Sequence, residues 1–166
     1  MRRPLAAAAG VALLLLDLNS ALALAILMPL DERLRSSAFI GLVDVSATVP
    51  QPRVPSPRHS DTTFLQIALG RVVQTVKGPL RPDDAIEIDF DNGFRCPNVD
   101  YEPGQRYLVF LARDANGRYS TVNYEAGRYK VEHGRVDGMA VELQDRLAVQ
   151  EALDKLATMT HTKRDA

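Results

Sequence analysis

The chain has 166 residues with 20 basic and 21 acidic side chains, a near balance that leaves no surplus of cations to offset a phosphate backbone. Nucleic-acid binding is therefore excluded as the expected function. A single cysteine, Cys96, excludes an internal disulfide, so the fold must be stabilised by packing. This length is enough for one domain with its own core.

Residues 1–25 have the organisation of a secretory signal peptide. Two arginines precede the apolar run 5–16, and a small-x-small Ala-Leu-Ala motif follows at 23–25. The alternative is an uncleaved membrane anchor over residues 5–30. Asp17 disfavours the anchor, because a carboxylate at the centre of a spanning helix costs about 2.5–3.5 kcal/mol. Both interpretations predict an extracytoplasmic body, periplasmic or secreted, that contacts a membrane only if the segment stays uncleaved.

Residues 37–158 are predicted to form one β-rich domain, after a partly helical lead-in over 26–36 and before a tail over 159–166. Residues 50–58 are predicted to be a loop because they contain four prolines, which donate no ladder hydrogen bonds. Turns are expected at Asn92-Gly93, Asn116-Gly117 and His133-Gly134. The expected strands are 38–49, 62–76, 86–91, 107–111, 119–124, 128–132 and 135–136.

The strand over 86–91 has the clearest period. Apolar Ile86, Ile88 and Phe90 alternate with acidic side chains, which predicts one buried face and one solvated acidic face. The acidic face is also a candidate calcium site, but the calcium-loop pattern is incomplete and carboxylates two residues apart on a strand are widely spaced. A solvated face is the preferred interpretation. The acidic residues concerned are Asp83, Asp84, Glu87, Asp89 and Asp91.

The period changes to helical near the end of the chain. Leu143, Leu147, Leu153, Leu156 and Met159 predict an amphipathic helix that Asp137 caps, with Glu151 and Lys155 spaced as an ion pair. We expect its apolar stripe to pack on the strands. The pattern as a whole predicts a mainly β fold: a small antiparallel barrel with a C-terminal amphipathic helix, or alternatively a two-sheet sandwich.

Four segments within residues 36–136 resemble netrin-like domains, the class that includes the tissue inhibitors of metalloproteinases (TIMP-like domains). They are 36–43, 72–79, 86–88 followed by Cys96, and 103–111, in the family's order. The resemblance implies an OB-like barrel, often exported, with a terminal helix packed against it. The family's zinc-chelating N-terminal Cys-x-Cys has no counterpart near Ile26, so the resemblance does not extend to that mechanism. Cys96 stands where a family cysteine falls, without its partner.

The predicted function is binding of another exported or envelope protein. Arg53, Arg58 and His59, in the predicted hairpin loop over 50–61, are candidate partner-binding residues because binding side chains concentrate on loops held by a rigid scaffold. Cys96 is a further candidate, either as a thiol that pairs with another molecule or as a small buried side chain. The alternative function is a membrane-anchored structural protein of the envelope.

The sequence predicts no enzyme, no cofactor and no metal site. Its three histidines, His59, His133 and His161, are scattered and lack the spacing of zinc ligands. Its serines lack the glycine context of a nucleophile elbow. Catalysis would require the fold to gather groups such as Asp83, His133 and Arg71, and nothing in their spacing requires this.

Overall fold

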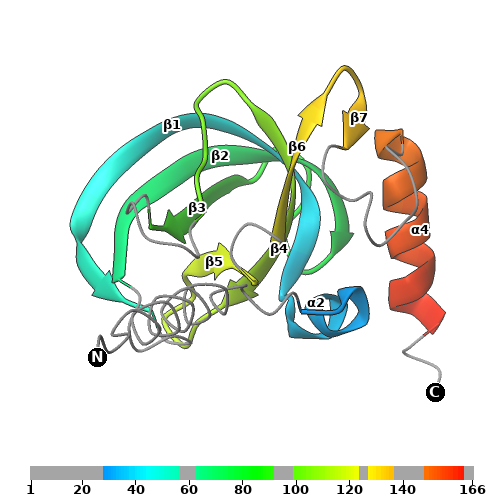
Figure 1. Ribbon diagram of the computed structural model, residues 1–166, viewed down its shortest axis with the longest axis horizontal. Helices are drawn as coiled ribbons and strands as arrows, with labels where there is room; N and C mark the ends of the chain where they lie inside the picture. Colours follow the sequence, from blue (N-terminus) through cyan, green and yellow to red (C-terminus); the bar gives the residue numbers. More distant parts are fainter. Residues whose placement is uncertain (1–27, 57–62, 92–98, 124–126, 137–147, 163–166) are drawn as a thin grey trace, which may run out of the picture.

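The structure is a computed structural model, and it describes residues 28–56, 63–91, 99–123, 127–136 and 148–162. Within these ranges a short helix, α2 (Leu30–Ser36), precedes seven strands, and the helix α4 (Val149–Thr162) follows them (Figure 1). Neither described helix has the length and hydropathy needed to cross a bilayer. The predicted leader, residues 1–25, lies outside the described residues. The strands are β1 (Phe39–Pro55), β2 (Thr63–Lys77), β3 (Ala85–Phe90), β4 (Arg106–Arg113), β5 (Tyr119–Thr121), β6 (Arg128–Glu132) and β7 (Arg135–Val136).

Five strands close into a ring in the order β1-β2-β3-β5-β4, because β1 pairs with both β2 and β4. β6 then pairs with β4, and β7 with β6. The mainly β fold, with a closed ring of strands followed by a C-terminal helix, is confirmed, and the sandwich alternative is not the fold. One pair in the ring, β3 with β5, is parallel. A closed ring with an odd number of strands cannot alternate direction at every step, so a purely antiparallel five-stranded barrel was not attainable.

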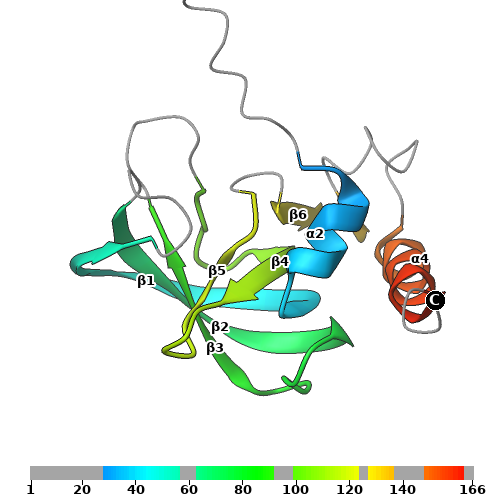
Figure 2. The ribbon, with the colours of Figure 1, turned by 90° about the horizontal axis from the view of Figure 1, so that it is seen from below.

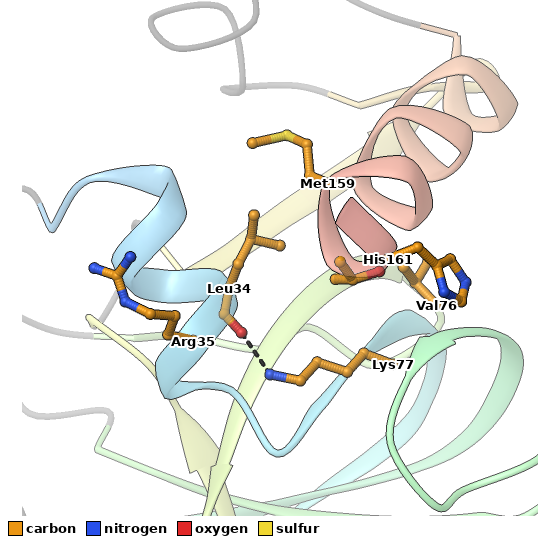
Figure 3. A pocket seen from close by; sticks show the side chains of 7 residues that line it. Leu34, Arg35, Val76, Lys77, Met159 and His161 are labelled. Atoms are coloured by element: carbon orange, nitrogen blue, oxygen red, sulfur yellow. Dashed lines mark hydrogen bonds between the residues drawn. The ribbon is translucent and has the colours of Figure 1, made fainter. Parts of the chain in front are cut away.

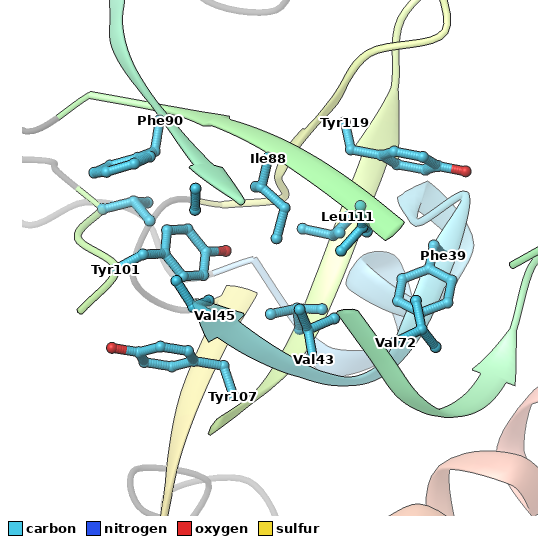
Figure 4. Packing of buried hydrophobic residues seen from close by; sticks show 14 residues of the cluster. Phe39, Val43, Val45, Val72, Ile88, Phe90, Tyr101, Tyr107, Leu111 and Tyr119 are labelled. Carbon is cyan, nitrogen blue, oxygen red and sulfur yellow. The ribbon is translucent and has the colours of Figure 1, made fainter. Parts of the chain in front are cut away.

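The interior of the ring is filled by one of two apolar clusters (Figure 4). Ile86, Ile88 and Phe90 all point into it, as the alternation predicts. Tyr101 lies at its centre, edge-to-face with Phe90 at 5.4 Å and with Tyr107 at 5.2 Å between ring centroids. The Tyr101 hydroxyl is hydrogen-bonded to Thr121 Oγ1 at 2.8 Å, and burial raises its pKa. The polar end of this large side chain is thus satisfied inside the barrel.

The second cluster joins the ring to the two helices. Leu34 from α2 and Leu156 from α4 pack with Phe110 and other outward-facing side chains of the ring. Leu153 is 2% exposed and Leu156 is 0% exposed, so the predicted packing of the helix on the barrel is confirmed. The helix runs to Thr162, so the first four residues of the predicted tail are helical. Glu151 and Lys155 form the expected ion pair at 3.3 Å, whereas Leu143, Leu147 and the Asp137 cap lie outside the described residues.

The predicted loop over 50–58 is wrong for its first six residues, because β1 continues to Pro55. β1 has β4 as its neighbour only over Phe39–Asp44. Past that point, among the described residues, β2 is the one strand paired with β1, so a proline nitrogen on the other side breaks no ladder. The pairing is also irregular between Pro50 and Val54, which places Pro52 in a bulge.

The predicted turns have mixed outcomes. His133 and Gly134 both have positive φ, 50° and 73°, and connect β6 to β7 as expected. Gly117 has φ 86° in the connection between β4 and β5, where its amide donates to the Asp114 carbonyl at 3.1 Å. These two turns are confirmed, and the predicted Asn92-Gly93 turn lies outside the described residues.

Candidate functional site on the β1–β2 arm

The hairpin of β1 and β2 extends beyond the β4 neighbour, and we call its distal part, residues 46–55 and 63–69, the arm. Its two strands are in register through Ala47 with Leu69 and Val49 with Ile67. Figures 1 and 2, two perpendicular views, both place the end of β1 and α4 at opposite ends of the molecule. The arm is therefore remote from the helical end.

One face of the arm is apolar and points away from the core. Ala68 pairs with Ile88, and both are fully buried in the ring interior, so the neighbouring residues on β2 face outward. We call the four residues on this face the outer strip: Ala47, Val49, Ile67 and Leu69. All four are partly exposed, and neither core cluster of the described residues includes them. Within the part of the chain that the structure describes, the outer strip is therefore an apolar surface that belongs to neither core cluster.

The arm is fastened to the ring by a polar cluster of Gln51, Asp89 and Arg118, which we call the latch. Asp89 on β3 lies opposite Ile67, hence on the outer face, and is 5% exposed. Arg118 donates from Nε to Asp89 Oδ2 at 2.6 Å and from Nη2 to Asp89 Oδ1. Gln51 donates to Asp89 Oδ1 at 3.0 Å and accepts from Arg118 Nη2 at 2.5 Å. The latch connects the arm, β3 and the turn before β5.

The hydrogen bonds between Arg118 and Asp89 in the latch join two charged groups. The hydrogen bonds to Asp89 raise the pKa of Arg118, so the guanidinium stays charged. The carboxylate is the buried partner, with 6% of its side chain exposed against 38% for Arg118. Such a pair restricts the relative position of the two segments, because the guanidinium and the carboxylate must be aligned for both hydrogen bonds to form. We therefore expect the latch to restrain the arm relative to the ring.

The predicted solvated acidic face is wrong at Asp89, because the Gln51 and Arg118 side chains cover its carboxylate. Glu87 is exposed and Asp91 is partly exposed. The reason is that β1 continues over the end of β3 and brings Gln51 onto the carboxylate. Among the residues that the structure describes, no three histidine, cysteine, aspartate or glutamate side chains are grouped as metal ligands.

The predicted partner-binding residues are only partly placed. Arg53 is exposed on the arm, within the bulge of β1. Arg58, His59 and Cys96 lie outside the described residues. Of the groups considered for catalysis, Arg71 donates from Nη1 to the backbone carbonyl of Asp83 at 2.6 Å, and His133 lies in the β6–β7 turn.

Sequence reasoning missed the outer strip and the latch. A signal for the strip was present, because β2 has apolar residues on both faces around Ile67 and Ala68, although a barrel strand buries only one face. The latch left no local signal. Its members are 29 to 67 residues apart in the chain.

The described residues define a closed five-stranded ring that displays an apolar strip on a latched hairpin arm. No family model and no curated protein sequence matches this chain. Its function is therefore inferred from the geometry of the arm.

Proposed function

We propose that this chain is an exported binding module that holds another envelope protein against the outer strip of its β1–β2 arm. The observation that carries the proposal is the strip itself: four apolar side chains face away from both core clusters. Covering them with a partner removes apolar area from water, at about 25 cal/mol per Å². The latch holds the arm in place beforehand, which reduces the ordering cost of association.

Two features of the sequence support this proposal. The leader over residues 1–25 directs the body out of the cytoplasm, where its partners would be other exported proteins. The resemblance to TIMP-like domains favours a protein as the partner, by a contact other than cysteine chelation. Arg53 is exposed farther along the same arm and supplies a cation there.

Capture of the partner is expected to depend on the outer strip. The full chain, tagged and cross-linked in its own cells, should recover a defined partner, and Ile67→Lys should reduce that recovery at least tenfold. The lysine would place a charge at the centre of the buried contact. Thr158→Lys makes the same charge change on the exposed face of α4 and should leave recovery unchanged.

Thermal melting of both variants checks that they fold, and we expect melting temperatures close to that of the parent chain because Ile67 is outside the core clusters. Equal recovery of the same partner by the parent chain, Ile67→Lys and Val49→Lys would overturn the proposal.

A further inference from the structure

The arm has one free strand edge among the residues that the structure describes. Over Phe39–Asp44, β1 lies between β2 and β4, but past Asp44 its one strand partner is β2. A strand edge with unpaired N–H and C=O groups is a template for pairing with another chain, above all where apolar side chains are exposed beside it. Val49 of the outer strip is on this edge strand. The arm therefore combines two features that favour self-association.

The other end of the hairpin is covered by the fold. At the end of β2, Lys77 Nζ donates to the backbone carbonyl of Leu34 in α2 at 2.6 Å (Figure 3). Val76 of β2 and Met159 of α4 line a cavity of about 270 Å³ beside this contact. The prolines of β1 and β2 all lie in the arm instead: Pro50, Pro52 and Pro55. Proline thus occurs in the part of the hairpin whose described edge is free.

The hydrogen bonds of β2 show which way its backbone groups point. The Val72 N–H donates to the Asp84 carbonyl at 2.9 Å, and the Val72 carbonyl accepts from the Asp83 N–H at 2.8 Å. The polar groups of Val72 therefore point towards the β3 side. Because backbone groups alternate between the two sides of a strand, those of Gly70 and Gln66 also point towards β3. The residues opposite them on β1 must then point away from β2.

Pro50 is one of these residues, because it lies opposite Gln66. Val45, opposite Gly70, obeys the same rule, since its N–H donates to the Gln105 carbonyl at 2.9 Å on the β4 side. Past the end of the β4 pairing, the same side of β1 is the free edge. Pro50 therefore presents a carbonyl at this edge but no N–H.

Further features interrupt the edge beyond Pro50. The pairing of β1 with β2 is irregular just after this residue, and Pro52 lies in the bulge. The next side chain, Arg53, is charged and exposed. Prolines, bulges and charged side chains are the devices by which edge strands avoid pairing with other chains. Within residues 47–50, Thr48 is the one residue that offers both an N–H and a C=O at the edge.

We propose that Pro50 and Pro52 prevent the free edge of β1 from pairing with the same edge of a second copy of this chain. Two copies are the relevant pair, because identical edges can meet antiparallel about a two-fold axis. Such pairing would join the two arms into one continuous sheet with both outer strips on one face. The proposal concerns the chain alone and does not rest on the partner of the outer strip.

A double variant tests the role of the prolines. Pro50→Thr/Pro52→Thr restores two N–H donors with a residue type that favours strands. Sedimentation equilibrium of the purified full chain should show that the double variant self-associates at least tenfold more tightly than the parent chain. Pro79→Thr makes the same change at an exposed proline outside the described strands, and should leave self-association unchanged.

Amide hydrogen exchange locates the contact. In the parent chain the Thr48 N–H should exchange faster than the Val49 N–H, which points towards β2. In the double variant, protection of Thr48 should rise with protein concentration. Self-association no tighter than that of the parent, or self-association that leaves Thr48 unprotected, would overturn the proposal. If the double variant does not fold, the parent decides: rapid exchange of Thr48 at every concentration supports the proposal, and protection that rises with concentration contradicts it.

Discussion

Arg118→Met is expected to lower the free energy of unfolding by about 2–3 kcal/mol. Asp89, which is 5% exposed, would lose its guanidinium partner and keep the Gln51 amide as its neighbour in the latch. Burying a carboxylate without its counter-charge is costly. The Arg118 side chain is 38% exposed, so water partly screens the pair and the loss stays below the 3–5 kcal/mol typical of deep burial. Denaturant unfolding at neutral pH, followed by circular dichroism, measures the change.

A matched control breaks an exposed ion pair instead. Arg106→Met removes the partner of Asp44, where the two side chains are 44% and 48% exposed, and should cost less than about 1 kcal/mol. The double variant Asp89→Leu/Arg118→Met should recover part of the loss, because it leaves no buried charge. Equal losses for Arg118→Met and Arg106→Met would show that the latch does not hold a buried charge.

Leu156→Ala is expected to lower the free energy of unfolding by about 2–5 kcal/mol. Leu156 is 0% exposed in the cluster that joins α4 to the ring, so its truncation removes apolar contacts and leaves a cavity. At about 2–4 °C per kcal/mol, the melting temperature should fall by roughly 4–20 °C. Thermal unfolding of the full chain, followed by circular dichroism, measures this.

Thr158→Ala provides the comparison on the same helix. Thr158 is exposed, and alanine favours helix, so its effect should stay within about 0.5 kcal/mol. A Leu156→Ala variant that melts at the temperature of Thr158→Ala would mean that α4 does not pack on the ring.

The elements that sequence reasoning predicted well are those with local causes. The alternation of Ile86, Ile88 and Phe90 follows from the period of a single strand, and the His133-Gly134 turn from its own backbone preferences. The continuous apolar run 107–111 was predicted to be a strand, and all five of its residues are 0% exposed. Each of these features depends on neighbours a few residues away.

The elements that were missed depend on distant partners. Whether a strand tolerates Pro50 and Pro52 is decided by where β4 ends beside β1, which the local sequence does not contain. In the sequence Asp89 alternates with apolar residues, which predicts a solvated side chain. In the structure the side chains of Gln51 and Arg118 cover it. Long-range packing therefore determined the candidate sites more than local pattern did.

The proposed function requires an arm that is fixed before any partner arrives. Amide hydrogen exchange of the free full chain measures this directly. We expect the paired amides within residues 47–49 and 66–69 to exchange as slowly as those of β4, and we expect Arg118→Met to accelerate exchange in the arm but not in β4. Arm amides that exchange at the rate of an unstructured peptide, beside a protected β4, would contradict it.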